Sequence, residues 1–307
     1  MAQKTDLNVA PYYDDFDSTD NFHKILFRPG FAVQARELTQ LQSILQNQIE
    51  RHGNNIFKDG TVIVPGQMSF SNAYDSVKLA TTFGGEDVVP AQYYNASSPV
   101  IVTGATSGVQ AEVVGYKDGT STSQPTLYVK YIKTGNDYAT ETFSDSENIS
   151  ANASITHTTA YASNIASATT HTSASQTGSA AKVETGIYYV RGQFVRVAEQ
   201  TLVLSDSSTT VSKRVGFSIT ETLVTPETDS TLTDNATGSS NYAAKGAHRL
   251  KIELSLASLD TTSTADSTFL EVMRVSSGIV ANSARNTEYS VLGDTLARRT
   301  FDESGDY

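Results

Sequence analysis

The chain has no cysteine and no tryptophan, and only 18% of its 307 residues are charged. Without cysteine it has no disulfide bond, no thiolate metal ligand and no thiol nucleophile, which suits folding in a reducing cytosol. No stretch approaches the roughly 18 consecutive apolar residues of a membrane-spanning helix. The N-terminus also lacks the apolar core of a signal peptide. We therefore expect no membrane insertion.

A basic surface is missing as well. The chain holds 22 Lys and Arg against 33 Asp and Glu, which gives a formal charge of −11. Phosphate backbones bind through clusters of Lys and Arg, and no run of five such residues occurs. The sequence therefore predicts no nucleic-acid partner, and we interpret the acidic balance as a source of solubility.

Motifs for catalysis or cofactor binding are also absent from the sequence. There is no nucleophile elbow, Walker loop, dinucleotide fingerprint or zinc-binding H-E-x-x-H pattern. The acidic residues 14–20 lack the central Gly and closing Glu of a calcium loop. We expect no enzyme, no cofactor and no metal site. A glycan hydrolase is the remaining enzymatic alternative, because its carboxylate pair is defined by geometry and not by spacing.

Residues 1–33 are predicted to form an extended arm. Four aspartates at positions 14 to 20 interleave with aromatic residues, and Pro29-Gly30 breaks the chain before the next element. Aromatic side chains in an acidic arm typically anchor it on another surface, in the same chain or in a neighbour. We expect the docking residues of the arm to be Tyr12, Tyr13, Phe16, Phe22 and Phe27.

The clearest helix is predicted for residues 34–52, which contain no Pro or Gly and are followed by Gly53-Asn54. Apolar residues recur there at three- and four-residue spacing, so they share one face. That face either packs on its own domain or forms a short coiled-coil seam between identical chains. The pattern covers fewer than three heptads, which is short for a coiled coil. A polar Gln at a seam position can set the register between the paired helices. The predicted self-association residues are Leu38, Leu41, Leu45, Gln48 and Ile49.

A short motif occurs twice in the remaining, strand-like sequence. Residues 60–68 and 186–194 both follow the pattern G-x-x-x-V-x-G-Q with an apolar residue after it. We interpret them as two hairpins of one sheet, each with a turn Gly at positive φ, and the sequence between them as an insertion. The alternative is chance, because Val and Gly are common in hairpins.

The fold class expected is mainly β with one N-terminal amphipathic helix, small β-barrel or sandwich domains and an extended N-terminal arm. Residues 1–80 would hold the arm, the helix and the first hairpin. Residues 81–183 would form an inserted β-domain, and 184–307 a second β-domain with a closing segment that reads as though it continues in a longer chain. The Ser/Thr-rich tract 144–181 is interpreted as a solvated loop or a segment that orders only against a neighbour.

Two segments resemble a known family. They are residues 11–66 and 294–307, and the likeness rests on the sequences FRPG at 27–30, AREL at 35–38, QLQ at 40–42 and DTLARRTFDESGDY at the end. Together they resemble the N-terminal region of large virion proteins of tailed bacteriophages, especially cyanophages, known only as a domain of unknown function. The middle of the chain adds little to the likeness.

The resemblance implies a structural component of the virion tail, in the baseplate or at the attachment of a tail fibre. Such a protein would form a homo-oligomer, with a trimer favoured, and would dock to other tail or baseplate proteins after assembly in the host cytoplasm. The alternative is a receptor- or carbohydrate-binding tail module, an adhesin. Tyr93, Tyr94 and Tyr128 are the candidate residues for stacking on sugars.

Overall fold

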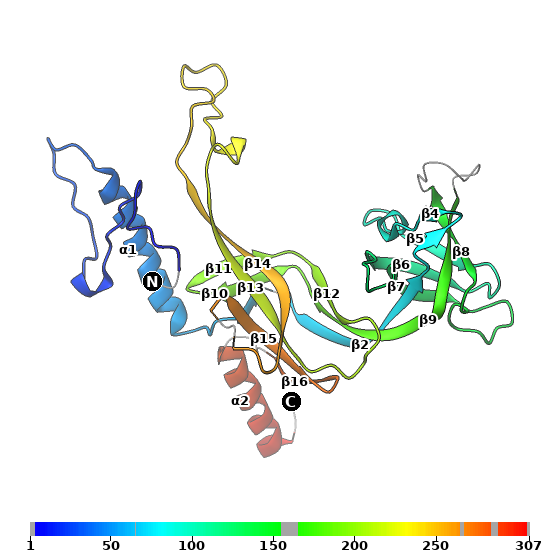
Figure 1. The fold of residues 1–307 in the computed structure, drawn as a ribbon. Coiled ribbons are helices and arrows are strands. Elements are labelled where there is room, and N and C mark those ends of the chain that lie inside the picture. Colours follow the sequence, from blue (N-terminus) through cyan, green and yellow to red (C-terminus); the bar gives the residue numbers. More distant parts are fainter. Residues whose placement is uncertain (1–3, 65, 155–164, 265–266, 284–287, 306–307) are drawn as a thin grey trace.

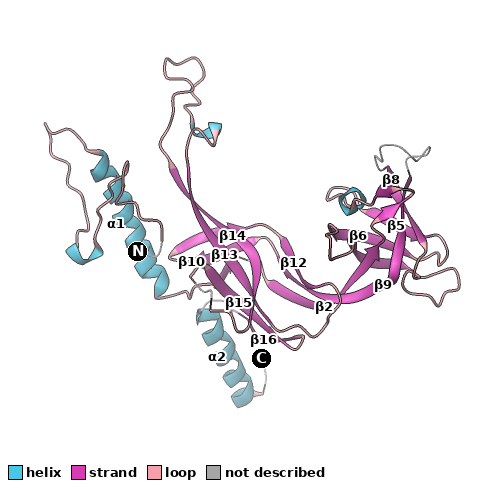
Figure 2. Cartoon of the chain, viewed as in Figure 1, coloured by secondary structure: helices cyan, strands magenta, loops and turns pink. Residues whose placement is uncertain are grey.

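The computed structural model describes residues 4–64, 66–154, 165–264, 267–283 and 288–305. These residues form a mainly β chain with two α-helices and three short 3-10 helices (Figures 1 and 2). The helices are α1 (Ala35–Asn54), α2 (Glu288–Ser304), η1 (Ser18–Asp20), η2 (Pro90–Tyr93) and η3 (Ser230–Leu232). The expected fold class is thus confirmed, including the N-terminal helix.

Helix α2 is an element that the sequence prediction missed. Its segment contains an interior Gly293 and the β-branched Thr295 and Thr300, all of which have weak helix propensity. Figure 1 shows α2 projecting from the sheet that holds β15 and β16. The side chains described in it, from residue 295 to residue 304, are all exposed.

Six antiparallel strands close into a β-barrel. Pairing runs in the order β2-β7-β6-β5-β8-β9, and β9 pairs back onto β2. Side chains alternate along the strands, so those that face inward form one core, which includes Val77, Val102, Leu127 and Ile149. The strands are β2 (Met68–Leu79), β5 (Val100–Gly104), β6 (Gln110–Lys117), β7 (Thr126–Lys133), β8 (Asn148–Ser154) and β9 (Ile165–Val183). A small pair, β3 (Thr82–Phe83) and β4 (Glu86–Asp87), follows β2.

The Ser/Thr-rich tract supplies two of these strands, which corrects the interpretation of a solvated loop. Residues 155–164 lie outside the described residues, and the tract on either side of them forms β8 and most of β9. Strand β9 pairs with β8, β2 and β12, and its Ala174, Ala180 and Ala181 are buried. Backbone pairing on both edges therefore outweighs the low apolar content that suggested a loop.

Two further sheets and strand β12 (Gln200–Ser205) form what we call the body. One sheet has the order β1-β10-β11 and the other β14-β13-β15-β16. Their shared core includes Val183, Tyr188, Phe217 and Leu254, with the rings of Tyr188 and Phe217 edge to face at 4.7 Å. The strands are β1 (Val62–Val64), β10 (Gly186–Val190), β11 (Gln193–Val197), β13 (Lys213–Val224), β14 (Arg249–Asp260), β15 (Phe269–Ser276) and β16 (Ile279–Ser283).

The two copies of the repeated motif share a sheet only in part, because Val62 of β1 pairs with Tyr188 of β10 while Met68, at the end of the first copy, belongs to β2 in another sheet. The second copy is a hairpin whose turn residues Arg191 and Gly192 both have positive φ (49° and 75°), as a type I′ turn requires. The first copy is not a hairpin. Its two strands diverge, since β1 pairs with β10 while β2 pairs with β9 and β7.

The molecule is elongated, with α1 and the barrel at opposite ends (Figure 1). The paired strands β2 and β9, which we call the ribbon, run from the body into the barrel. The hairpin β13–β14 projects separately from the body, and its two strands pair over all 12 residues of each. Among the described residues, no helix is long and apolar enough to cross a membrane.

Candidate interaction surface of the arm and helix α1

Helix α1 begins with a capping box. The backbone N–H of Gln34 donates to Oε2 of Glu37 at 2.9 Å, and the Gln34 side chain accepts from the backbone of Glu37 in return. Arg51 and His52 lie in the last turn, where positive charge complements the helix dipole. The predicted helix over residues 34–52 thus agrees with the observed bounds to within two residues.

The buried side of α1 is largely polar. Ser43 and Asn47 are buried beside Ile44, and the Ser43 hydroxyl donates to the carboxylate of Asp14 in the arm. At the other end, Gly53 lies against the ring of Tyr189, where a Cβ would come within 2.4 Å of the Tyr189 hydroxyl oxygen. That hydroxyl donates to Oδ1 of Asn54 at 2.9 Å. The helix is therefore held by hydrogen bonds and one close ring contact.

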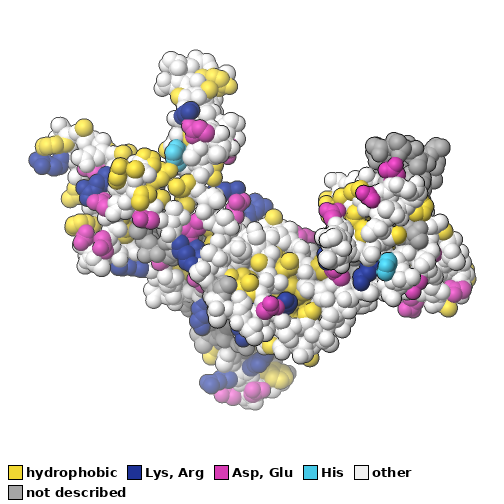
Figure 3. Space-filling model, viewed as in Figure 1, with side chains coloured by type: hydrophobic (Ala, Val, Ile, Leu, Met, Phe, Trp, Pro, Cys, Tyr) yellow, Lys and Arg dark blue, Asp and Glu magenta, His cyan; other side chains and the backbone are white. Residues whose placement is uncertain are grey.

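The predicted self-association face points away from these contacts. Leu38, Leu45 and Ile49 are 50%, 57% and 53% exposed, Leu41 is half-buried, and Gln48 is exposed. Positions seven and four residues apart lie above one another on a helix, so the three exposed residues form what we call the apolar stripe. In Figure 3 hydrophobic side chains gather over the end of the molecule formed by the arm and α1.

Aspartates fasten the arm to α1. The Arg36 guanidinium donates to both carboxylate oxygens of Asp15, at 2.8 and 2.6 Å, and Gln40 donates to the same carboxylate at 2.6 Å. The hydrogen bond from Arg36 lowers the pKa of Asp15 below its usual value. The sequence prediction assigned the anchoring role to the aromatic residues of the arm. Along α1 the short hydrogen bonds to the arm are instead accepted by Asp14 and Asp15, and Gln48 Nε2 lies 3.5 Å from Nδ1 of His23.

The predicted docking residues of the arm divide into two groups. Tyr12 and Phe16 are half-buried, and the Tyr12 hydroxyl lies 2.6 Å from Nδ1 of His248, the residue before β14. Tyr13, Phe22 and Phe27 are 60%, 65% and 48% exposed. Tyr12 thus contacts the loop end of the hairpin β13–β14, while three of the five predicted docking residues are exposed.

The beginning of the arm is held by a carboxylate that the sequence analysis missed. The Glu221 side chain, 6% exposed, accepts from the backbone N–H groups of Lys4 and Thr5 at 3.0 and 2.8 Å. It also accepts from Arg191 at 2.5 Å. Burial alone would raise the pKa of Glu221, but these hydrogen bonds outweigh burial and lower it. Glu221 lies on β13, more than 200 residues from its arm partners, so no local spacing pattern could reveal it.

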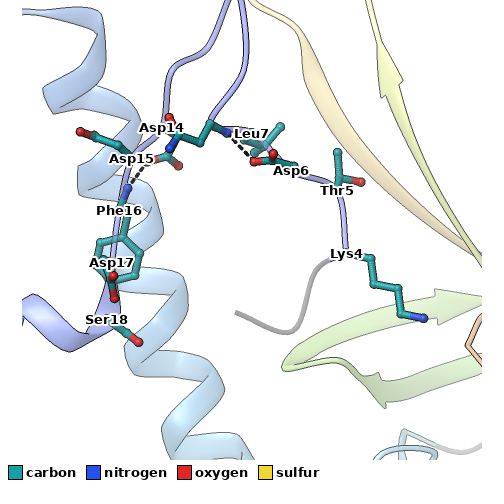
Figure 4. A pocket seen from close by; sticks show the side chains of 10 residues that line it. Lys4, Thr5, Asp6, Leu7, Asp14, Asp15, Phe16, Asp17 and Ser18 are labelled. Carbon is teal, nitrogen blue, oxygen red and sulfur yellow. Dashed lines mark hydrogen bonds between the residues drawn. The ribbon is translucent and has the colours of Figure 1, made fainter.

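A polar pocket of about 400 Å³ lies between residues 4–8 and 14–18 of the arm (Figure 4). Its carboxylates already have partners. Asp6 accepts from the Asn8 N–H at 2.9 Å, and Asp17 accepts from the Thr19 N–H and hydroxyl, which lowers the pKa of Asp17. Within the described residues, no group of three or more His, Cys, Asp or Glu is arranged to hold a metal ion. The pocket is therefore best explained as the space left where the arm folds back on itself.

The candidate sugar-stacking residues are only partly available. Tyr93 is 1% exposed and lies in the barrel core, and Tyr128 is 6% exposed with its hydroxyl donating to Asp206. The sequence prediction is wrong for these two. Tyr94 is 37% exposed, and its ring lies 5.8 Å from that of Tyr116, which is 39% exposed.

These features define a mainly β protein whose N-terminal helix and arm offer an open apolar surface. The family model described as a domain of unknown function (DUF4815) matches residues 10–83 and 145–307. The chain belongs to this family, because the two matched segments make up most of its length. Neither the curated proteins nor the solved structures gave a match.

The family match passes over residues 84–144, which contain β4 to β7. Three strands of the barrel, β5, β6 and β7, therefore lie outside the matched segments. The other three, β2, β8 and β9, lie inside them. The arm from residue 10, helix α1, the ribbon, the body and α2 all belong to the part that matches the family.

Proposed function

We propose that the chain is a non-enzymatic structural protein of a tailed-phage virion. It would act in the baseplate or as an anchor for a tail fibre, associating with copies of itself and docking to other tail proteins. The resemblance of residues 11–66 and 294–307 to large phage virion proteins supports the viral setting. The single observation that carries the proposal is the apolar stripe on α1.

The stripe favours a helical partner of the same kind. Leu38, Leu41 and Leu45 follow the three- and four-residue spacing of a coiled-coil seam. Each Leu or Ile removed from water contributes about 1.5–3 kcal/mol when it is fully buried. Since α1 meets its own chain through Ser43 and Asn47, the stripe is open to α1 helices of other copies. Three such helices would form the favoured trimer.

The arm next to α1 supports docking to other tail proteins. Its return segment between η1 and α1 carries several exposed large apolar side chains, and large exposed apolar patches mark sites of protein interaction. Two of the predicted docking residues, Phe22 and Phe27, are among them. The whole set is Phe22, Leu26, Phe27, Phe31 and Val33.

Light scattering over a tenfold range of protein concentration tests self-association. We expect the unchanged chain to have three times the mass of one chain, and the variant L41D/L45D to have the mass of one. The matched control is Gln46→Asp, which places a charge at an exposed position of the same helix outside the stripe. An L41D/L45D variant that keeps the mass of the unchanged oligomer would refute the seam.

Glycan binding by the barrel is a second candidate function, supported by the exposed pair Tyr94 and Tyr116. Tyrosine rings give an amphipathic surface at low cost in conformational entropy. The test is the binding of the full chain to host cells and to host polysaccharide, compared with the variant Y94A/Y116A. Equal binding by both proteins, or no binding by either, would count against this function.

A further inference from the structure

The barrel is joined to the body by the ribbon, and the ribbon has an irregularity where the two parts meet. On the body side, Met68 to Ser71 pair with Val183 to Ala180. On the barrel side, pairing resumes with Tyr74 opposite Gly178. The register shifts between Ser71 and Tyr74, and such bulges bend a strand and increase its twist. The ribbon is thus bent and twisted at this place, and a second register shift lies within the barrel, between Val77 and Leu79.

The segment after β12 crosses the ribbon at the same level. Ser205, the last residue of β12, pairs with Ser179 of β9, and the next residue is Asp206. A Cβ on Gly178 would lie 2.0 Å from the Ser205 carbonyl oxygen and 2.7 Å from the Asp206 carbonyl carbon. Only Gly at position 178 lets the two backbones approach this closely.

Asp206 then contacts three strands of the barrel. Its Oδ1 accepts from the Tyr128 hydroxyl of β7 at 2.7 Å, and its Oδ2 accepts from Lys117 Nζ of β6 at 2.6 Å. Its backbone carbonyl accepts from the Ser76 hydroxyl of β2 at 2.9 Å. The Asp206 side chain is 22% exposed, so these charge-assisted bonds are partly shielded from water.

We infer that Asp206 is a lock across a hinge in the ribbon, and that it holds the barrel in one orientation on the body. The lock joins residues that lie inside the family match to residues that lie outside it. Lys117 and Tyr128 lie in residues 84–144, outside the family match, whereas Asp206 and Ser76 lie within it. Asp206 therefore fixes the strands outside the match onto the framework that the family shares. This inference does not depend on the proposed function.

Spin labels can test the lock directly, because the protein has no native cysteine. One label is placed on the barrel and one on the body by the exposed substitutions Ser121→Cys and Ser255→Cys. Pulsed electron paramagnetic resonance then measures the distribution of distances between them. We expect one narrow distribution for the parent and loss of that narrow peak, with a broad distribution in its place, for Asp206→Ala.

Three controls separate hinge motion from other causes. A label pair within the barrel, Ser121→Cys with Glu141→Cys, should keep its distance distribution in the Asp206→Ala background. Glu199→Ala removes an exposed ion pair with Lys182 on the body side of the ribbon and should change nothing. The variant K117M/Y128F removes both side-chain donors and should broaden the barrel–body distribution as Asp206→Ala does.

A narrow, parent-like barrel–body distribution in both Asp206→Ala and K117M/Y128F would overturn the inference. Asp206→Asn keeps an acceptor for Tyr128 but loses the charge that faces Lys117. We expect it to give a distribution of intermediate width. If the pair within the barrel broadens equally in Asp206→Ala, the residue stabilises the barrel itself, and the lock is refuted.

Discussion

The barrel and the arm–helix region represent opposite ways of holding a chain together. In the barrel, inward side chains such as Val77, Val102 and Leu127 are fully buried, and the strands close on themselves. At α1, the contacts with the same chain are mainly hydrogen bonds to Asp14 and Asp15, while Leu45 remains exposed. The barrel buries its apolar side chains within the chain, whereas the arm–helix region leaves apolar side chains exposed, where other molecules can contact them.

The largest effect should come from a cavity in the barrel. Leu127→Ala should lower the free energy of unfolding by about 2–5 kcal/mol, because a fully buried side chain leaves a void. The matched control is Leu45→Ala, which should change the free energy of unfolding by no more than about 0.5 kcal/mol when the chain is monomeric. Urea unfolding of both variants measures the difference. Equal decreases in the free energy of unfolding would show that Leu45 is buried in its own chain as firmly as Leu127.

A smaller effect should follow from crowding the contact between α1 and the body. Gly53→Ala places a methyl group against the Tyr189 ring, and overpacking typically costs about 1–3 kcal/mol. The cost should appear as faster amide hydrogen exchange in α1, with the barrel unchanged. Gln46→Ala, at an exposed position of the same helix, serves as the control. Unchanged exchange in Gly53→Ala would mean that Tyr189 does not secure the helix.

Acid should weaken the attachment of the arm to the body. The pKa of Glu221 is lowered in the folded protein, so the stability it contributes is present above the ordinary glutamate pKa of about 4.3. That stability is lost as the pH falls through the lower, folded pKa. The difference in unfolding free energy between the parent and Glu221→Gln should therefore shrink at acidic pH. A difference that stays constant down to the acid transition would contradict this role.

The smallest effect concerns the exposed pair of Asp15 and Arg36. Exposed ion pairs add little to stability, so Arg36→Ala should leave global unfolding nearly unchanged. Its effect should be local, as faster protease cleavage of the arm. Lys245→Ala breaks an exposed pair with Glu227 elsewhere and provides the control. Equal cleavage of the arm in both variants would show that Asp15 does not hold it.

The parts of the fold that could be predicted are those with a local signal. The three- and four-residue spacing from Leu38 to Ile49 located α1, and the motif at residues 186–194 located the hairpin of β10 and β11. Strand β9 could not be found in this way, because its Ser, Thr and Ala residues have no apolar periodicity. Its structure is set by partners distant in sequence, such as Met68 opposite Val183.

The candidate surface could be predicted only in outline. The spacing along α1 identified the apolar stripe, but it could not show that Ser43 would be the buried contact. The partners of the arm were out of reach because Glu221 and His248 lie more than 200 residues from the residues they bind. The lock at Asp206 combines residues 76, 117, 128 and 206, which share no motif.

The hairpin β13–β14 has a mechanical consequence. Two fully paired strands of 12 residues make a beam about 40 Å long, given about 3.3 Å per residue. The arm binds the hairpin through Glu221 and His248, which lie in the half beyond the pairing of β13 with β15. Because β13 also pairs with β15 from Lys213 to Ser218, only the residues beyond Ser218 project from the sheet, over about 20 Å at about 3.3 Å per residue. A tilt of about 5° over that length moves the strand end by about 2 Å, by simple geometry. A small shift of α1, passed on through the arm, therefore acts on the projecting half of the hairpin and not on the half that β15 holds in the sheet.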